Sequence, residues 1–425
     1  MANRARLPAQ AFDRIAILEH IHSSGPVSRA DLARDLGMRP SSVTDWVRLL
    51  IAKGILAEVG QGGSNGGRPP VLLDVDRANN YTVGVTAEPR GLLAALVRWD
   101  GSVLARAQRQ LSASSESAAL QREALSAAEE VLAAADVPRG RVRGVGVGLS
   151  ALVDPVANEA IFSSTFTSAR NLRLDAMAER LALPVYLEDI AYLMALGERW
   201  FVYPNEQRPL VFLLIASGAC GAVIEPWASP GASRFAAEFG HMVLDVNGPL
   251  CGCGKRGCLE AFVSEPAILA TAARLLSAGG NGPATLADIV ALAKAGNPVA
   301  ERIIASVAQH LGVATANLAN VFAPALIVLG GAVIDAWGEQ LVGGVRAVVK
   351  EHLIEYLLPG VDIVGSKLGP DAPLMGSAAR VMQAFFAAPQ ADGTRAQSEA
   401  VPSLGAALDV AYLHRPLPVS PTGPG

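Results

Sequence analysis

The first apolar pattern in the chain has helical spacing. Apolar side chains recur every third position from Phe12 to Ile21, which predicts an amphipathic helix. Ser28 and Asp31 resemble a capping box, with aspartate in the place of the usual glutamate, and predict the start of a second, short helix. Pro40 suits the first position of a third helix, where its missing N–H has no partner to lose. The three predicted helices cover residues 11–23, 28–36 and 40–53.

The segments after the third helix alternate between strand and loop signals. Residues 55–59 and 71–75 are mostly apolar and predict two strands, and residues 60–70 between them form a glycine-rich loop. Together with the tight turn at Gly37, this order predicts a winged helix-turn-helix. The helical pattern alone also allows a generic three-helix bundle, and the two strands favour the winged form.

A winged helix-turn-helix contacts DNA mainly through the first turns of its last helix, which enter the major groove. The glycine-rich loop suits the minor groove, where an arginine meets an enhanced negative potential. Polar exposure alone also explains these side chains, and no base sequence can be derived from them. The candidate DNA-binding residues are Ser41, Ser42, Thr44, Asp45, Arg48 and Arg68.

From about residue 79 the pattern changes to apolar strands separated by helices. The turn at Asp100 and Gly101 joins two of the strands as a hairpin. Strands that alternate with helices indicate an α/β architecture. The predicted strands cover residues 81–86, 92–98, 102–106, 142–148, 185–187, 210–215 and 325–329, and the predicted helices cover residues 115–135, 174–181, 297–322 and 335–354.

The composition of the 425 residues is that of a globular protein, with 51% hydrophobic and 17% charged residues. The formal net charge is −4, but it is uneven: residues 1–73 hold 9 Lys and Arg against 6 Asp and Glu. A mildly basic head on an acidic body is compatible with DNA binding by the head alone. No run of 18 apolar residues and no signal peptide is visible, so we expect a soluble, cytoplasmic protein without membrane contact.

Three of the four cysteines lie within eight positions. Cys251, Cys253 and Cys258 are separated by glycines, and His241 precedes them by ten residues. Three thiolates and an imidazole form a usual closed, tetrahedral zinc site. The alternatives are four unrelated small or buried residues, or a disulfide, which would leave one of the three thiols over.

The spacing of these residues resembles the zinc signature of the ROK family, which contains sugar kinases and sugar-responsive repressors. The family pattern is Gly-His, a gap, and then Cys-x-Cys-Gly-x-x-Gly-Cys-x-Glu, and residues 240–260 match it at every defined position. Residues 11–75 resemble the head of ROK repressors, which ROK sugar kinases lack. The resemblance implies structural Zn²⁺ and a two-lobed, actin-like body over about residues 80–387.

The resemblance also implies a cleft for a sugar or a sugar-derived effector between the two lobes. The effector-binding residues would be Glu238, His241 and Glu260, with Asp189 on the opposite wall. The expected domains are a winged helix-turn-helix at 1–75, a small lobe at 76–187, a large lobe at 188–387 whose last helix packs on the small lobe, and a disordered tail at 388–425.

Three motifs that a kinase of this family needs are changed. The family sequence Asp-x-Gly-Gly-Thr aligns with Thr-Ala-Glu-Pro-Arg at 86–90, and Gly-Thr-Gly-x-Gly aligns with Ala-Ser-Gly-Ala-Cys at 216–220. Ile190 occupies the position of the catalytic aspartate and cannot accept a proton. We therefore expect no enzymatic activity and no catalytic residue.

The resemblance and the changed motifs together predict a DNA-binding transcriptional repressor that responds to a sugar-derived effector. It would bind operator DNA as a homodimer or homotetramer, because two heads match a near-palindromic site. Two alternatives stay open. One is an ATP-dependent sugar kinase with a regulatory DNA-binding head, and the other is a DNA-binding protein with no effector.

Overall fold

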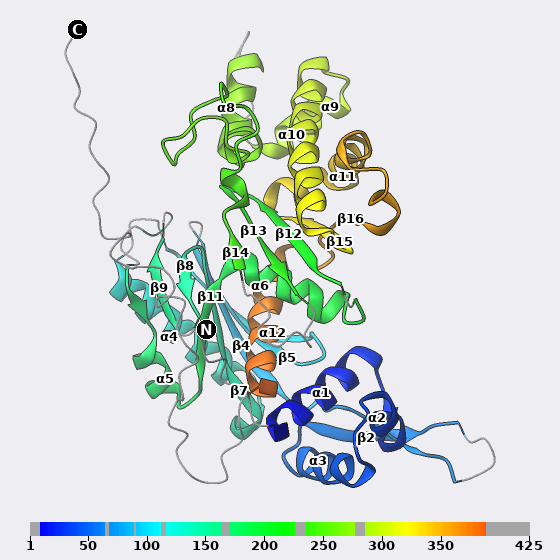
Figure 1. Ribbon diagram of the computed structural model, residues 1–425. Helices are drawn as coiled ribbons and strands as arrows, with labels where there is room; N and C mark the ends of the chain where they lie inside the picture. Colours follow the sequence, from blue (N-terminus) through cyan, green and yellow to red (C-terminus); the bar gives the residue numbers. More distant parts are fainter. Residues whose placement is uncertain are drawn as a thin grey trace, which may run out of the picture.

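The protein consists of a small head and a body of two lobes (Figure 1). In the computed structural model the described residues are 9–63, 68–88, 91–111, 116–155, 157–163, 166, 170–206, 208–225, 235–276 and 285–387. Two predicted segments lie outside these ranges: the disordered tail at 388–425 and the tip of the wing at 64–67. Where the chain is described, no helix is long and apolar enough to span a bilayer.

The head is a three-helix unit with a three-stranded sheet in the order β1-β3-β2. The predicted capping box is present: the Ser28 hydroxyl accepts a hydrogen bond from the Asp31 backbone, and Asp31 accepts one from the Ser28 backbone. The third helix buries Val43, Val47 and Leu50, the apolar line that its sequence spacing produces. The elements are α1 (Ala9–Ser24), β1 (Val27–Ser28), α2 (Arg29–Asp35), α3 (Pro40–Ala52), β2 (Leu56–Gln61) and β3 (Val71–Val75).

The small lobe is built on a five-stranded sheet in the order β11-β7-β4-β5-β6. One face is covered by α4 (Ser117–Ala134), and the other by α12 (Ala372–Ala387) from the end of the described chain. The sheet strands are β4 (Tyr81–Glu88), β5 (Gly91–Arg98), β6 (Val103–Arg109), β7 (Val142–Leu149) and β11 (Val185–Asp189); the lobe also contains η1 (Arg139–Arg141), β8 (Leu152–Asp154), β9 (Glu159–Phe162), β10 (Leu172–Arg173) and α5 (Asp175–Leu181).

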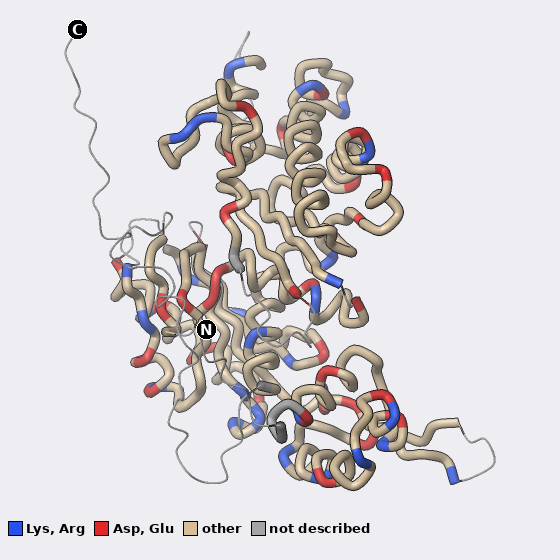
Figure 2. The backbone as a smooth tube through the Cα atoms, viewed as in Figure 1, with Lys and Arg blue, Asp and Glu red and all other residues tan. Residues whose placement is uncertain are grey.

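The large lobe is built on a second five-stranded sheet, in the order β14-β13-β12-β15-β16. One face packs on α6 and the other on the long helices α10 and α11. Figure 2 shows the central strands without charged residues, as their apolar sequences require. The elements are α6 (Ile190–Gly197), η2 (Glu198–Val202), β12 (Leu210–Ile215), β13 (Ala219–Ile224), β14 (Phe235–Ala237), η3 (Phe239–His241), α7 (Glu260–Val263), α8 (Glu265–Leu276), α9 (Leu286–Lys294), α10 (Pro298–Phe322), β15 (Leu326–Gly330), α11 (Ala332–His352), η4 (Leu358–Gly360), β16 (Asp362–Gly365) and η5 (Gly369–Asp371).

Candidate metal centre and ligand cleft

The fold brings the three cysteines and the histidine together. Each residue contributes one ligand atom, and the four atoms of His241, Cys251, Cys253 and Cys258 lie within 4.8 Å of one another. The Cys253 and Cys258 sulfurs are 3.7 Å apart, and Cys251 Sγ lies 3.8 Å from His241 Nδ1. Thiolates about 2.3 Å from a tetrahedral Zn²⁺ lie about 3.8 Å from each other. The sulfur separation suits a shared metal ion and exceeds the length of a disulfide bond.

Residues 242–258, named the metal-binding loop after their candidate ligands, contain turns that favour glycine. The Cys251 N–H donates to the Lys255 carbonyl, and the Gly254 N–H donates back to the Cys251 carbonyl, which closes a tight loop around the sulfurs. Gly254 has a φ of +82° and Gly257 a φ of +71°, both in the left-handed region. A Cβ on Gly257 would also collide with the Asp245 carbonyl. The glycines noted in the sequence therefore determine the cysteine geometry.

The protonation of the thiols couples metal binding to proton release. Burial raises the pKa of Cys251 to about 12 and also raises the pKa of Cys258. A hydrogen bond from the Lys255 backbone lowers the pKa of the exposed Cys253 thiol. A divalent cation binds thiolates, so it must displace the protons of the two buried thiols when it enters this site.

Three of the predicted effector-binding residues, Asp189, Glu238 and Glu260, act electrostatically on the thiol of Cys220. Burial raises the pKa of Cys220 well above its ordinary value, and the negative charges of Asp189, Glu238 and Glu260 raise it further. Glu238 approaches the metal site too, with its Oε2 at 3.8 Å from His241 Nε2. His241 can therefore offer Nδ1 to a metal and Nε2 to the cleft. In the sequence Cys220 is only the last residue of a changed phosphate motif, and its place near these carboxylates follows from the fold.

Glu260 connects the metal-binding loop to the turn between β12 and β13. Its Oε2 accepts a hydrogen bond from the Ala219 backbone (3.0 Å), and its Oε1 lies 3.5 Å from Cys251 Sγ. This turn is the counterpart of the family's second phosphate motif. The carboxylate of Glu260 fixes the turn relative to the metal-binding loop, whether or not it also contacts an effector.

Asp189 has a structural role in addition to the effector contact predicted for it. It is the N-cap of α6, and its Oδ1 accepts hydrogen bonds from the Ala191 and Tyr192 backbones (2.8 and 3.1 Å). Ile190, at the position of the family's catalytic base, is buried in the first turn of this helix. Burial raises the pKa of Asp189 to about 7, against the lowering effect of the two backbone hydrogen bonds and with a smaller contribution from the carboxylates of Glu188 and Glu238.

Asp189→Asn is expected to stabilise the protein more at high pH than at low pH. Because the folded pKa of about 7 exceeds the ordinary 3.8, the stabilising contribution of Asp189 is complete below pH 3.8 and is lost as pH rises through 7. Asparagine caps the helix equally well without that loss. Urea unfolding should show the advantage of the variant growing by about 1–3 kcal/mol from pH 5 to pH 8.

A matched control for this titration is Asp175→Asn. Asp175 is an exposed carboxylate whose pKa is lowered by its hydrogen bond with Arg173. It is ionised throughout the range from pH 5 to pH 8, so its variant should show no such growth. An advantage of Asp189→Asn that is the same at both pH values would contradict the assignment of this titration to Asp189.

The predicted DNA-binding side chains lie on α3 and at the edge of the wing. Asp45 and Arg48 are both 74% exposed and form an ion pair (3.2 Å). The Thr44 hydroxyl donates to the Pro40 carbonyl within the helix (2.8 Å), which reduces its availability to DNA. Arg68 is exposed. Arg39, directly before Pro40, is an exposed cation at the N-cap of α3 and lies at the same end of the helix as these side chains.

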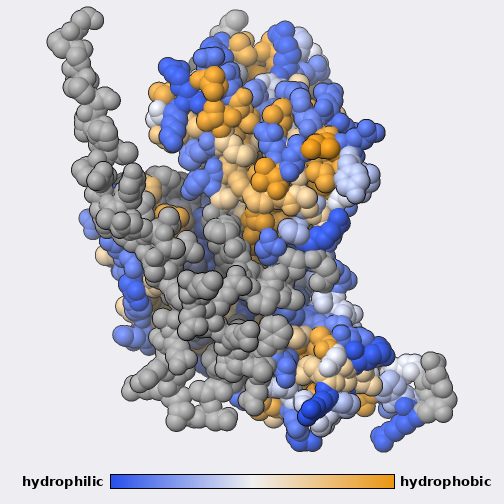
Figure 3. Space-filling model, viewed as in Figure 1, coloured by the Kyte–Doolittle hydropathy of each residue, from blue (hydrophilic) through white to orange (hydrophobic). Residues whose placement is uncertain are grey.

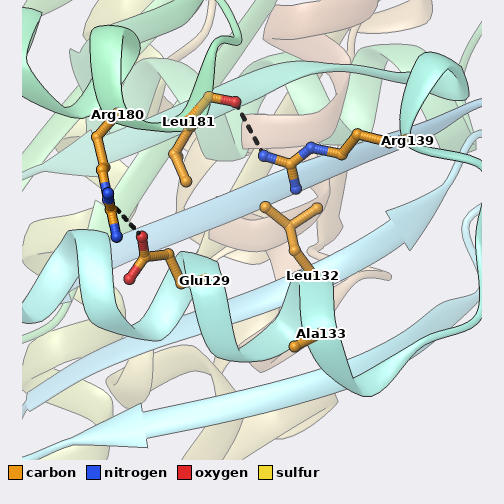
Figure 4. A pocket seen from close by; sticks show the side chains of 6 residues that line it. All are labelled: Glu129, Leu132, Ala133, Arg139, Arg180 and Leu181. Carbon is orange, nitrogen blue, oxygen red and sulfur yellow. Dashed lines mark hydrogen bonds and ion pairs between the residues drawn. The ribbon is translucent and has the colours of Figure 1, made fainter.

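A surface hollow of about 520 Å³ lies away from this cleft, beside α4 and α5 (Figure 4). Its arginines already have acceptors: Arg180 pairs with Glu129 (3.1 Å), and Arg139 donates to the Leu181 carbonyl (2.9 Å). It contains none of the predicted site residues.

Comparison with known proteins agrees with this geometry. A putative xylose repressor from Caldicellulosiruptor sp. (strain Rt8B.4) is 28% identical over 400 residues, which cover 92% of this chain and 99% of the relative. A glucokinase from Thermotoga maritima is 31% identical over 255 residues, or 56% of this chain and 79% of the enzyme. The fold resembles that of a ROK family transcriptional regulator, a homologue of the E. coli MLC protein, with a TM-score of 0.76, 23% identity and coverage of 89% of this chain and 97% of that one. The ROK family model matches residues 83–384, and the chain belongs to the ROK family.

Proposed function

We propose that this protein is a DNA-binding transcriptional repressor whose cleft binds a sugar or a sugar-derived effector. The main support for this proposal is the share of the chain that aligns with each relative. The repressor relative aligns with 92% of the chain, whereas the glucokinase aligns with 56%. The head itself has the three helices and the paired strands of a winged helix-turn-helix. The first effector to test is xylose, from the name of the relative.

We further propose that the cluster of His241, Cys251, Cys253 and Cys258 binds structural Zn²⁺. Three thiols and one imidazole at these separations are a usual closed zinc site. The metal would fix the loop that carries His241 and, through Glu260, the turn at Ala219. Zinc would thereby shape one wall of the cleft and would take no part in a reaction.

A sugar kinase with a regulatory head is the second candidate, and the glucokinase relative favours it. Against it, Ile190 offers no proton acceptor at the base position. The side chain of Cys220 also occupies the position of the last glycine in the second phosphate motif. We therefore assign no catalytic residue.

The active form is proposed to be a homodimer or homotetramer, because two heads are needed to bind both halves of a near-palindromic operator. Apolar residues are exposed on the large lobe (Figure 3). They include Val321 at 74%, Ile354 at 62% and Tyr356 at 90% exposure. Such a surface is suited to a subunit contact.

Fluorescence anisotropy with the DNA upstream of the protein's own gene tests the proposal. At fixed salt, we expect binding at least about 10³-fold tighter than to random DNA of equal length. Xylose or another sugar of a panel should change that affinity. Phosphorylation of a sugar by ATP would favour the kinase, and tight binding that no sugar alters would favour a DNA-binding protein without an effector.

Arg68→Ala is expected to weaken operator binding by about five- to tenfold and to reduce the salt dependence by about one phosphate contact. The exposed guanidinium at the wing would lose its attraction to the minor groove or the backbone. Salt titrations of the anisotropy measure both quantities. Arg122→Ala is the matched control, since Arg122 is 69% exposed on α4 in the body. Equal effects of the two variants would refute a DNA contact by Arg68.

A further inference from the structure

The helix that begins at the ligand cleft is buried along its whole length. Asp189 is the N-cap of α6, and its Oδ1 accepts hydrogen bonds from the backbone N–H groups of Ala191 and Tyr192 in the first turn (2.8 and 3.1 Å). Every residue of α6 is buried. A ligand that moves the Asp189 carboxylate therefore moves the first turn of a helix that has no free surface to absorb the displacement.

α6 crosses α12 with the two backbones in contact. A Cβ on Gly197 would lie 2.9 Å from the Gly376 backbone nitrogen and 3.1 Å from the Ala372 carbonyl oxygen. A Cβ on Gly376 would collide with the Leu193 carbonyl. No compressible side chain separates the helices at this crossing. We call the two helices, residues 190–197 and 372–387, the α6–α12 unit, because neither can shift without the other.

A buried carboxylate ties this unit to the junction of the two lobes. α6 continues into the π-helical turn Glu198–Val202, a conformation that often occurs at functional sites. Glu198 Oε1 accepts hydrogen bonds from Ser366 Oγ (2.5 Å) and the Leu368 backbone (3.0 Å). The segment of these donors leads from β16 of the large lobe to α12. Glu198 thus joins the two stretches of chain that pass between the lobes.

The far end of the unit packs against α1 of the head (Figure 1). The Trp200 ring lies 4.5 Å from the His22 ring and 5.7 Å from the Phe386 ring, measured between centroids. The Phe386 carbonyl accepts a hydrogen bond from the buried guanidinium of Arg14 (2.8 Å). These contacts place the head and the body in one apolar core.

The unit also reaches the end of α3, the helix proposed to enter the major groove. The Arg143 guanidinium lies over the Phe385 ring of α12 at 4.9 Å and donates to the Lys53 carbonyl (3.3 Å). Arg141 donates to the Gly54 carbonyl (3.0 Å). Lys53 is the C-cap of α3 and Gly54 follows it, so both guanidinium groups lie at the carboxyl-terminal end of the helix, where cations stabilise it. Arg143 therefore contacts α12 and α3 at the same time.

We infer that the α6–α12 unit transmits the state of the cleft to α3, through the contacts of Glu198, Trp200 and Arg143. The inference rests on the proposed function, which gives the cleft an effector and the head an operator. An effector changes operator affinity only if it prefers one arrangement of the protein. The α6–α12 unit adjoins Asp189 directly and reaches α3 through Arg143 of β7, so its position is what distinguishes the arrangements.

Hydrogen exchange of the full, ligand-free chain tests the mechanical connection. Gly197→Ala inserts a methyl group into the α6–α12 crossing. We expect it to accelerate exchange on the order of tenfold in α1 and at the end of α3, although the atoms nearest to the new methyl group belong to α12. The control is Gly312→Ala, which inserts a methyl group at the α10–α11 crossing, 2.5 Å from Val348 Cβ.

The control should accelerate exchange only within the large lobe. The inference would be overturned if Gly197→Ala accelerated hydrogen exchange only within α6 and α12. It would also be overturned if both variants accelerated exchange in the head equally. Should Gly197→Ala fail to fold, Trp200→Phe replaces it, since the smaller ring loosens the contact with His22. The same acceleration in α1 supports the inference, and unchanged exchange there overturns it.

A linkage measurement tests the regulatory part separately. In Trp200→Phe, the factor by which xylose changes operator affinity should fall toward one, while the affinity for xylose itself changes less than about twofold. A factor equal to that of the wild type would overturn the regulatory part. If neither xylose nor any other sugar of the panel changes the operator affinity of the wild-type protein, the proposed function fails. The hydrogen-exchange comparison still decides in that case whether the cleft and the head are mechanically connected.

Discussion

Cys258→Ser is expected to abolish stoichiometric zinc binding and to lower the thermal unfolding midpoint by about 10 °C or more. Cys258 is fully buried, and its sulfur lies 3.7 Å from that of Cys253. The loop from Met242 to Cys258 contains only two isolated β-bridges and a few turns. Such a loop has little stability of its own, so a metal ion bound to these four residues would supply most of the stability of the loop.

Metal analysis and thermal unfolding of the same preparations measure the effect. A strong chelator should lower the midpoint of the wild-type protein toward that of Cys258→Ser and should leave the variant unchanged. Cys220→Ala is the matched control, because Cys220 lies outside the cluster of ligands. It should retain about one zinc per chain. A variant of Cys258 that keeps full zinc and full stability would exclude the proposed metal site.

Loss of zinc should also weaken the response to an effector. His241 contributes Nδ1 to the cluster and approaches Glu238 through Nε2 at 3.8 Å. Glu260 holds the turn at Ala219 from the same loop. A loop without its metal would release both carboxylates from the cleft wall. Operator binding without effector should change less, since the head contacts the opposite end of the body.

Local patterns in the sequence determined much of this structure. The capping box at Ser28 and the proline at Pro40 each marked the beginning of a helix that the structure contains. The glycines between the cysteines were a sufficient signal for the metal-binding loop, because left-handed φ values are needed at Gly254 and Gly257. In each case, the cause lies within a few residues of its effect.

The parts that the sequence did not reveal depend on residues far apart in the chain. The segment 216–220 was interpreted as a changed phosphate motif, and its end forms the beginning of β13, which pairs with β12. Asp189 directly before an apolar run is a usual N-cap signal, so its capping of α6 was open to prediction. The hydrogen bond from Arg14 to Phe386 spans 372 positions and has no local signal at all.

Arg380→Met is expected to destabilise the protein by about 3–5 kcal/mol. Arg380 Nε donates to Glu188 Oε2 (3.1 Å), and both side chains are only 6% exposed. The guanidinium also covers the Tyr186 ring at 4.9 Å. Methionine fills a similar volume but leaves Glu188 as a buried carboxylate without its partner. The free energy of unfolding in urea, monitored by circular dichroism, measures the cost.

The double variant Glu188→Leu/Arg380→Met separates the charge from the packing. Removing both charges should recover most of the lost stability, because no buried charge is then left alone. The exposed pair of Arg106 and Asp371 is the control: both side chains are more than 40% exposed, and Arg106→Met should cost less than about 1 kcal/mol. A double variant as unstable as Arg380→Met would assign the loss to packing. Glu188 directly precedes Asp189 in β11, so the ion pair joins this end of the strand to α12. If the double variant recovers its stability but responds less to the sugar, the pair also keeps Asp189 in a fixed position relative to the α6–α12 unit.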